Sequence, residues 1–494
     1  MSGLEQASRE ELLALLAARD AQVARQSVQL DELLERVEEL TATNAKLVDQ
    51  VTELVARLGQ NSRNSSKPPS SDGPEAPERP SRRGKTGKRP GKQPGAPGSA
   101  LAQVDPARLD GIVDHVPAAC RGCGADLVGA ADAGMVRRQC HDIPPVSVQI
   151  TEHRLHKRRC GGCGVVTRAD APDGVSAPAS YGPGLRTLAV YLVVVQHIAV
   201  ERAAQLIADV TGAAPSTGWI STAVASCADA LEDVDALIRT LCALAAVLHV
   251  DETSTSIAGA RQWIHVAATG ALTAYFLHPS RGRVAVDEFG VLPGYAGTAV
   301  HDALSVYDGD QYATARHAYC GAHILRELAG AADRHLGQAW PDQAIRALTG
   351  LNAAAHDARR HGLQAIPPDI AGPLLAEWKH AILCGLADNP RRPGREQTKT
   401  RNLLERLRDH QNRVLAFARD LTVPFTNNQA ERDLRPAKTQ LKISGCHRST
   451  RGAEAWLRIR GYLSTARKNG HNAYTAIRDA ITGTPWKPAV PTGT

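Results

Sequence analysis

The chain has 494 residues, 43% of them hydrophobic and 22% charged, which excludes a wholly disordered protein and allows several packed domains. Its formal net charge of +7 favours a polyanionic partner without establishing one. The acidic N-terminal residues argue against a signal peptide, and the longest apolar run, 188–195, is too short for a membrane span. We therefore expect a soluble cytoplasmic protein with no membrane partner and with reduced cysteines.

Residues 1–58 carry a heptad repeat of hydrophobic residues. Valine or leucine recurs at the a position and leucine at the d position, with Arg19 and Gln26 as early interruptions and Asn44 at one a position. This period of 3.5 residues is typical of a parallel two-stranded coiled coil. We predict a helix over 9–58 that forms a homodimer or higher oligomer. An amphipathic helix packed on the chain's own core is the alternative.

Residues 59–100 lack Val, Ile, Leu, Met and aromatic residues. Proline, glycine and serine fill 22 of the 42 positions, and nine Lys or Arg residues stand against three acids. Such a composition cannot bury a core and predicts a disordered basic linker. Its basic cluster at 79–92 is either a phosphate-contacting arm or a solvated spacer. The candidate contacts are Arg82, Arg83, Lys85, Lys88 and Arg89.

Residues 115–170 contain two CxGCG knuckles, formed by Cys120, Cys123, Cys160 and Cys163. Two such turns supply the four sulfur ligands of a tetrahedral structural Zn²⁺, and the last glycine of each permits the tight turn. We predict a zinc ribbon with an inserted hairpin that includes a strand at 146–150, and with Cys140 as a bystander. A redox site is excluded because no thioredoxin-like pattern is present. Buried thiols without metal remain the alternative.

Residues 181–240 are predicted to be helical. A helix over 200–207, a glycine turn at Gly212 and a helix capped by Ser216 match a helix-turn-helix. Because plain helical domains often show the same pattern, the segment is either a DNA-binding domain or a packing domain.

Residues 241–320 alternate short strand patterns with turns. An apolar strand ends at Asp251, a hairpin follows over 263–277, and a short strand at 298–301 leads into Asp302. This order matches the ribonuclease-H-like fold, in which acids on the first and fourth strands meet and hold metal ions. Hard carboxylate oxygens suit Mg²⁺, with Mn²⁺ as a substitute, and two ions are expected.

A third metal ligand is needed from a helix after the sheet, and Glu431 is the candidate. No acid lies at 337–341, the spacing common in such enzymes, although Asp333 and Asp342 flank that window. Glu431 also stands three residues after Asn428, the arrangement of a capping box, in which it would bond only the helix backbone. Spacing alone supports the two roles equally.

The sequence resembles the DDE transposases of insertion sequence family 66 over nearly its whole length. The resemblance rests on the heptad helix, NSSKPPSSDG at 64–73, the CxGCG knuckles, VDET at 250–253 and NNQAERDLRP at 427–436. The first and last of the quoted sequence blocks are long and specific. The family implies a bacterial, nucleoid-associated enzyme.

The resemblance implies Asp251, Asp302 and Glu431 as catalytic and metal-binding residues. It also implies a multidomain α+β chain: a coiled coil, a zinc ribbon, and a ribonuclease-H-like core interrupted by an all-helical insertion at 321–425. Cys320 and His323 match a CxxH element that is either structural or metal-binding. The second acid block reads His-Asp-Ala here, whereas Thr-Asp-Gly is commoner in the family.

Residues 426–485 are expected to hold the catalytic helix and a basic C-terminal region. Ten Lys or Arg residues against two acids lie between residues 432 and 468, interspersed with Trp456 and Tyr462. This basic face would hold DNA phosphates, unless it is only a solvated surface. Arg458 and Lys468 belong to it, and its leading candidates are Arg432, Arg435, Lys438, Lys442, Arg448 and Arg451.

We predict a DDE-type transposase that performs Mg²⁺-dependent DNA cleavage and strand transfer. Its partners would be the element ends, target DNA and accessory transposition proteins. One alternative is a ribonuclease-H-type nuclease or resolvase without strand transfer. Another is a transposase-derived, non-catalytic DNA-binding regulator.

Overall fold

The structure is a computed structural model that describes residues 8–60, 100–172, 174–175 and 177–490. The predicted basic arm at 79–92, with Arg82, Arg83, Lys85, Lys88 and Arg89, lies outside the described residues. The chain divides into two compact units. Unit 1 comprises Met1–Pro77, Gly174–Ala203 and Ser216–Thr494, and unit 2 comprises Glu78–Asp173 and Ala204–Pro215.

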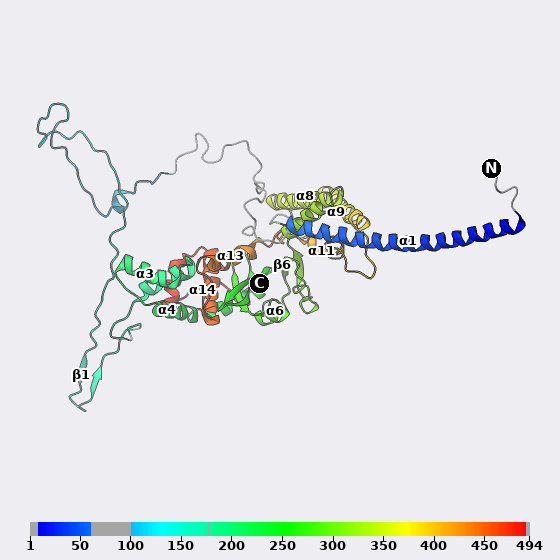
Figure 1. The fold of residues 1–494 in the computed structure, drawn as a ribbon. Helices are drawn as coiled ribbons and strands as arrows, with labels where there is room; N and C mark the ends of the chain where they lie inside the picture. Colours follow the sequence, from blue (N-terminus) through cyan, green and yellow to red (C-terminus); the bar gives the residue numbers. More distant parts are fainter. Residues whose placement is uncertain (1–7, 61–99, 173, 176, 491–494) are drawn as a thin grey trace. The chain divides into compact units, whose positions relative to one another are not determined.

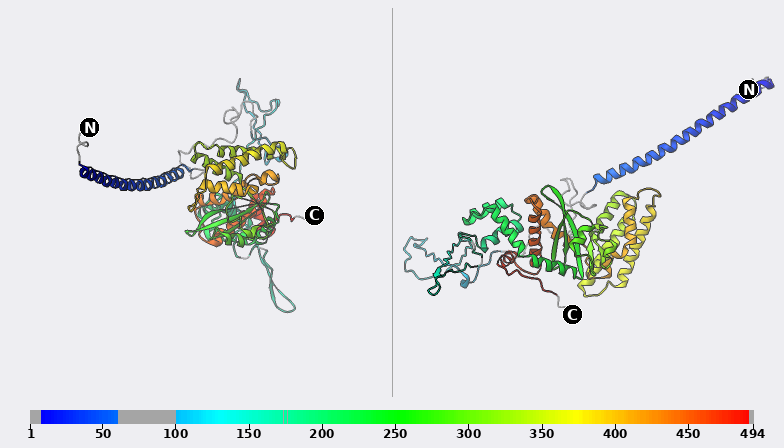
Figure 2. Two further views of the ribbon diagram at one scale, coloured as in Figure 1. Left: turned by 90° about the vertical axis from the view of Figure 1, so that its right-hand side faces the viewer. Right: turned by 90° about the horizontal axis from the view of Figure 1, so that it is seen from below.

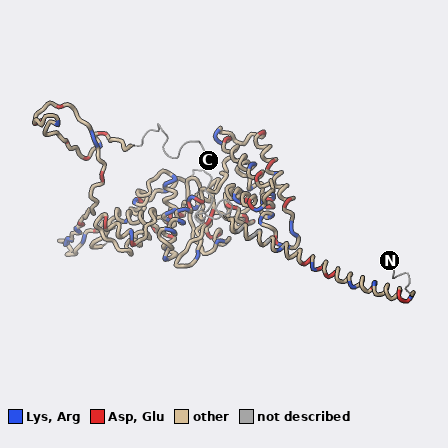
Figure 3. The backbone as a smooth tube through the Cα atoms, turned by 45° about the horizontal axis from the view of Figure 1, so that its top comes forward, with Lys and Arg blue, Asp and Glu red and all other residues tan. Residues whose placement is uncertain are grey.

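Helix α1 (Arg9–Leu58) is continuous and has the bounds expected from the heptad pattern (Figures 1 and 2). Acidic and basic residues follow one another along it (Figure 3). Its apolar seam is exposed: Leu33 and Leu40 at d positions are each 63% accessible, and Val37 at an a position is 57% accessible. The helix is therefore as predicted, and its seam is accessible to a second helix.

Unit 2 has little regular structure. Its first segment contains the short helix η2 (Pro106–Arg108) and an antiparallel hairpin of β1 (Lys157–Arg159) and β2 (Val166–Arg168). Its second segment, Ala204–Pro215, holds most of helix α3 (Val200–Thr211). The strand expected at 146–150 is wrong, because this segment is irregular and Ile150 is 91% exposed. Alternating hydrophobic residues form a strand only when they pair with a partner strand and pack on a core. In the described residues, this segment does neither.

Helices precede the sheet of unit 1. They are α2 (Pro183–Val190), the π-helix η3 (Tyr191–Val195), α3 (Val200–Thr211), α4 (Thr217–Asp229) and α5 (Glu232–Ala243). Ser216 caps α4 by accepting a hydrogen bond from the Trp219 N–H at 3.1 Å, as its sequence position predicts. Gly212 ends α3 with φ of 73°, a backbone conformation that favours glycine.

The centre of unit 1 is a five-stranded sheet in the order β5-β4-β3-β6-β7. Its strands are β3 (Val247–Ile257), β4 (Ala260–Ala268), β5 (Thr273–His278), β6 (Thr298–His301) and β7 (Arg316–Tyr319). Strands β3, β4 and β5 are antiparallel, whereas β6 runs parallel to β3 and to β7. The connection from β5 to β6 contains α6 (Arg283–Phe289), and η4 (Asp310–Tyr312) precedes β7.

The sequence prediction that the first strand ends at Asp251 is wrong. Strand β3 continues to Ile257, because β4 pairs with it residue by residue from His249 to the turn. The extension is not apparent in the sequence because polar residues follow Asp251. Beyond this point only one face of the strand is buried, so the run of consecutive hydrophobic residues ends.

Helices occupy the chain after β7. They are α7 (Gly321–Arg334), α8 (Trp340–Arg360), α9 (Pro368–Asp388), α10 (Lys399–Asp409), α11 (Gln411–Val414) and α12 (Ala416–Arg419). Trp340 and Trp378 are fully buried in their shared core. In the part of the chain that the structure describes, no helix is both long and apolar enough to cross a membrane.

The last helices return to the sheet. They are α13 (Asn428–Ile443), α14 (Thr450–Lys468) and α15 (Ala473–Ile481). Helix α13 packs on β3 and β4, and α14 packs on β5 (Figure 1). The chain segment that holds Glu431 thus lies against the strand that holds Asp251.

Candidate active site

Asp251 lies within β3, on the strand that pairs with both β4 and β6. Side chains alternate along a strand, so Asp251 shares a sheet face with His249. Burial, followed by the charges of Glu252 and Asp302, raises the pKa of Asp251 to about 7. A carboxyl group in this position resists ionisation unless a positive charge comes close.

Asp302 follows directly after β6, the parallel neighbour of β3. The register pairs Val247 with Thr298 and His249 with Val300, and its continuation by two residues places Asp302 beside Asp251. The Asp302 carboxylate accepts the Leu304 N–H at 3.0 Å, which fixes the turn after the strand.

The turn after Asp302 is strained because Ala303 occupies the position where a Thr-Asp-Gly sequence would have glycine. Ala303 has φ of 66°, in the left-handed region that glycine adopts freely and where an alanine is strained by about 1 kcal/mol. His301 supports the turn, because its Nδ1 accepts the Ala303 N–H at 3.3 Å. The commoner Asp-Gly sequence would form this turn without strain.

Glu431 is on the first turn of α13, and the capping-box alternative is wrong. The helix begins at Asn428 with Asn427 as its N-cap residue, and within the described residues no side chain caps this start. Glu431 is therefore the fourth helical residue, and the expected role of Asn428 as N-cap fails as well. The Glu431 carboxylate instead lies 4.0 Å from Nδ1 of His323.

Asn427 joins the elements that carry these groups. It is fully buried, and its Nδ2 donates to the Val250 carbonyl at 2.8 Å while its Oδ1 pairs with Nδ1 of His249 at 3.0 Å. Its backbone N–H donates to Sγ of Cys320 at 3.1 Å. Sequence reasoning missed this role, although Asn427 is the first residue of the NNQAERDLRP block.

Cys320 and His323 come from the start of α7 and face the acids. Burial lowers the pKa of His323, but its interaction with the Cys320 sulfur and the charge of Asp302 outweigh this effect, and the pKa rises to about 9. His323 also acts electrostatically on Asp251. His323 thus interacts with all three acids, although in the described part of the chain Asp251, Asp302 and Glu431 do not themselves form one ligand cluster.

Glu252 forms a second network beside Asp251. Its carboxylate is buried, bonds Arg281 at 2.7 Å and accepts a short hydrogen bond from the Tyr307 hydroxyl. Burial raises the pKa of Glu252. Sequence reasoning assigned no role to Glu252, and Arg281 and Tyr307 stand in no recognisable motif, so only the fold could reveal them.

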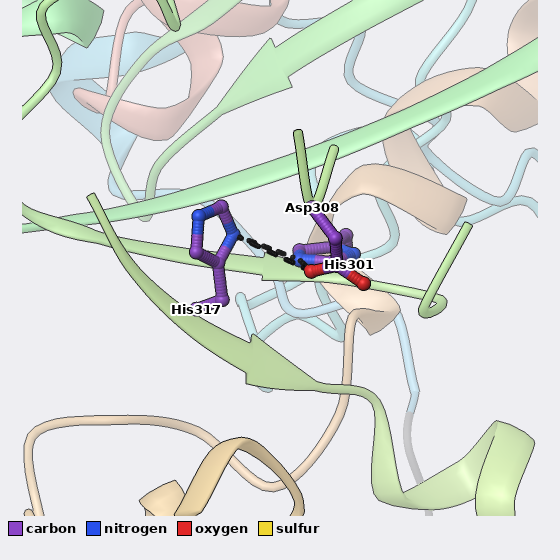
Figure 4. Close-up of side chains that lie close together, drawn as sticks. All are labelled: His301, Asp308 and His317. Carbon is purple, nitrogen blue, oxygen red and sulfur yellow. Dashed lines mark hydrogen bonds and ion pairs between the residues drawn. The ribbon is translucent and has the colours of Figure 1, made fainter. Parts of the chain in front are cut away.

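His301 at the end of β6, Asp308 in the segment after it and His317 on β7 lie close together (Figure 4). Nε2 of His301 lies 3.1 Å from Nδ1 of His317. Both oxygens of Asp308 are occupied, since Arg413 donates to one at 2.7 Å and the Tyr319 hydroxyl donates to the other at 2.6 Å. This cluster fits a hydrogen-bond network rather than a metal site.

The basic C-terminal region is exposed only in part. Between residues 432 and 468, the exposed basic side chains are Arg432, Arg435, Lys438, Lys442, Arg448, Arg451 and Arg467. Lys468 was expected on the DNA-binding face, and this expectation is wrong. Its ammonium group donates to Asp433 at 2.8 Å and to two carbonyls of the β4–β5 turn. Arg458 donates to a backbone carbonyl, and Trp456 and Tyr462 are buried. These four residues form packing contacts rather than a DNA-binding face.

Each predicted zinc knuckle is formed in unit 2. Gly124 and Gly164 take φ of 73° and 74°, and their N–H groups donate to the carbonyls of Cys120 and Cys160. Backbone N–H groups within each knuckle lower the pKa of Cys120 and Cys160, which favours the thiolates that Zn²⁺ needs. Among the described residues, however, Cys120, Cys123, Cys160 and Cys163 do not gather into one ligand cluster.

Comparisons with known families cover most of the chain. The model described as the transposase IS66 family matches residues 178–455, which include all three candidate acids. The zinc-finger binding domain of transposase IS66 matches 117–164, and a family of unknown function matches 16–102. No curated protein matches the chain.

Proposed function

The chain belongs to the IS66 family of transposases, and we propose that it is a DDE-type enzyme that cleaves DNA and transfers strands with Asp251, Asp302 and Glu431. The observation that carries this proposal concerns His323: it interacts electrostatically with Asp251 on β3 and with Asp302 after β6, and lies 4.0 Å from Glu431 on α13. Interacting acids from separate elements, one of them with a strongly raised pKa, are typical of a functional site.

The sheet supports a ribonuclease-H-like core. Its order, with the first three strands antiparallel and β6 parallel beside β3, is the order that this fold requires. The helices from α7 to α12 stand between Asp302 and Glu431 in the sequence, and we propose that they are the all-helical insertion of the core.

The acids fit a pair of divalent ions. Burial and the charges of Glu252 and Asp302 hold the pKa of Asp251 near 7, and bound cations would relieve this crowding. Asp251, Asp302 and Glu431 would supply the hard oxygen ligands that Mg²⁺ or Mn²⁺ prefers. When bound, such ions activate an attacking hydroxyl group and stabilise the leaving oxygen of a phosphodiester.

The surrounding residues would position DNA and the acids. Asn427 fixes the start of α13 against β3, so it sets where Glu431 lies relative to Asp251. Arg432 and Arg435 are exposed on the same helix and would contact DNA phosphates beside the acids. The basic arm at 79–92 would add contacts to the element ends or target.

The N-terminal helix and the zinc-finger domain complete the proposal. The match over 117–164 supports one structural Zn²⁺, held by the two knuckles. The exposed seam of α1 would pair two chains, as the joining of two element ends requires. Accessory transposition proteins are a further class of partner.

The test is a cleavage and joining assay. The purified chain is incubated with Mg²⁺, DNA that carries the ends of the element, and a target plasmid. We expect 3′ ends to be released and joined to the target. Cleavage without joining would favour the nuclease alternative, and Mg²⁺-independent binding without cleavage would favour the regulator.

A further inference from the structure

Three potential metal ligands of different chemistry meet beside the proposed catalytic acids. One ligand atom each from Cys320, His323 and Glu431 lie within 4.8 Å of one another. The proposed transposase chemistry uses Glu431 and leaves Cys320 and His323 without a function. Cys320 is buried, whereas His323 and Glu431 keep 21% and 26% of their side chains accessible. The cluster is therefore enclosed on one side and open on the other.

Two backbone contacts hold these ligands together. Gly321 donates its N–H to the Phe425 carbonyl at 2.8 Å, and Asn427 donates its N–H to Sγ of Cys320 at 3.1 Å. Both contacts dock the segment before α13 onto the start of α7. A Cβ on Gly321 would lie 2.2 Å from the Phe425 ring, so this approach requires glycine between Cys320 and His323.

The cluster has unmet bonding capacity. Nδ1 of His323 is buried and has no hydrogen-bond partner among the described residues, and buried polar atoms are rarely left so. Its 4.0 Å distance to the Glu431 carboxylate is too long for a hydrogen bond. Ligand atoms around a zinc ion, with bonds of about 2.0–2.3 Å, stand roughly 3–4 Å apart.

The chemistry of the donors selects the cation. A thiolate, an imidazole and a carboxylate suit a borderline-soft ion, whereas Mg²⁺ binds oxygen ligands. The backbone N–H that Asn427 donates to Cys320 is the contact expected of a thiolate ligand. Asp302 acts on His323 with negative charge and Arg326 with positive charge, and Asp251 interacts with the same imidazole.

We propose that Cys320, His323 and Glu431 bind a Zn²⁺ ion, separate from the zinc of the ribbon, with a fourth position open to water or a phosphate oxygen. Three protein ligands and one open position are typical of a zinc ion that contacts substrate. The site goes beyond the proposed transposase chemistry but shares Glu431 with it: one carboxylate oxygen of Glu431 would bind Zn²⁺, and the other would remain for the catalytic ions. Its occupancy is measured without DNA.

The test uses the full-length chain with the ribbon knuckle broken by Cys123→Ser, which removes the other zinc site. After dialysis against buffer that contains excess Mg²⁺ and no zinc, elemental analysis should find one zinc per chain. With Co²⁺ in its place, a thiolate-to-cobalt charge-transfer band should appear. Adding Cys320→Ser or His323→Gln should weaken binding by at least about 100-fold, because each removes a ligand.

A matched control is Cys384→Ser. Cys384 also lies next to a histidine, with Sγ 3.4 Å from Nε2 of His380, and its loss should change neither the zinc content nor the band. Circular dichroism and the melting temperature identify variants that fail to fold, and His323→Gln preserves the volume of the side chain.

Two results would overturn the proposal. One is a zinc content and cobalt band that survive both Cys320→Ser and His323→Gln in folded protein. The other is a loss of zinc in Asp251→Asn as large as the loss in Cys320→Ser, which would assign the ion to the proposed catalytic acids. Neither result depends on cleavage activity, so a failed transposition assay leaves this test intact.

Discussion

At the scale of single residues, Asn427 decides the geometry of the candidate site. One buried amide bonds the backbone beside Asp251, the ring of His249 and, through its main chain, Cys320. Without its side chain, the Val250 carbonyl and the His249 ring lose their partners inside the protein. The position of Glu431 relative to Asp251 then depends on weaker contacts.

Asn427→Ala should therefore reduce the free energy of unfolding by about 2–4 kcal/mol, since each unpaired buried group costs about 1–3 kcal/mol. Metal-dependent cleavage should fall with it. The matched control is Asn428→Ala, because Asn428 is exposed and is the residue that a capping box would need. Equal losses in the two variants, measured by urea unfolding, would contradict the role of Asn427.

The raised pKa of Asp251 predicts a pH dependence of stability. Its pKa is about 7 in the folded protein, because of burial and then the charges of Glu252 and Asp302, against an ordinary value of 3.8. A carboxyl group with a raised pKa stabilises the fold below its ordinary pKa, and this contribution is lost as the pH rises to about 7.

In Mg²⁺-free buffer, the wild-type melting temperature should thus fall more between pH 5 and pH 8 than that of Asp251→Asn. The Asn variant cannot ionise and keeps its neutral group at both pH values. Added Mg²⁺ should restore the wild type at pH 8 and have less effect on the variant. If the melting temperatures of the two proteins fell equally between pH 5 and pH 8, ionisation of Asp251 would not be the cause of the pH dependence.

The site could be predicted from the sequence only where motifs exist. Asp251, Asp302 and Glu431 were found from strand patterns and from a family resemblance. Asn427 stands in the same block, but spacing favoured its neighbour Asn428 as the cap, because a capping box is defined by local spacing. Arg281 and Tyr307 bond Glu252 across the fold, and no local pattern records such contacts.

At the scale of elements, the helices and strands with a regular hydrophobic pattern were predicted correctly. The bounds of α1 and the hairpin of β4 and β5 follow from hydrophobic periodicity, which operates within a segment. The extension of β3 beyond Asp251 and the absence of a strand at 146–150 depend on what pairs with each segment. Pairing is a property of the tertiary fold, so the sequence pattern was wrong in both places.

The seam of α1 predicts a dimer. Leu40 is 63% exposed at a d position, and we expect Leu40→Glu to place a charge in the coiled-coil core and shift the chain toward monomer. Val28, 59% exposed, lies at the outward f position, so Val28→Glu is the control and should stay dimeric. Light scattering that finds all three proteins monomeric would refute the coiled coil.

The zinc ribbon predicts a local dependence on metal. Cys123→Ser should lower the zinc content by one ion per chain and make residues 115–170 sensitive to protease, because metal supplies much of a ribbon's folding energy. Unit 1 has its own core and should keep its melting transition. Cys140→Ser is the control, and an equal loss of zinc in that variant would contradict the assignment of the knuckles.

At the scale of the whole molecule, the chain separates its tasks among segments. The candidate acids lie on the sheet and α13, the arginines and lysines proposed to contact DNA lie on α13 and around the start of α14, and the knuckles lie in unit 2. DNA binding and DNA chemistry should therefore be separable by substitution. This expectation distinguishes a metal-dependent enzyme from a regulator that only binds DNA.

The central claim is that Asp251, Asp302 and Glu431 form one metal-dependent catalytic centre. The direct measurement compares DNA cleavage and DNA binding, with Mg²⁺, by Asp251→Asn, Asp302→Asn, Glu431→Gln and the control Glu454→Gln, whose exposed acid lies on α14. We expect the first three to lose cleavage by more than about 100-fold, since outer contacts of a metal site already cost 10- to 100-fold. Their DNA affinity should stay near that of the wild type, and the control should remain active. Near-native cleavage by any one of the three would contradict the account.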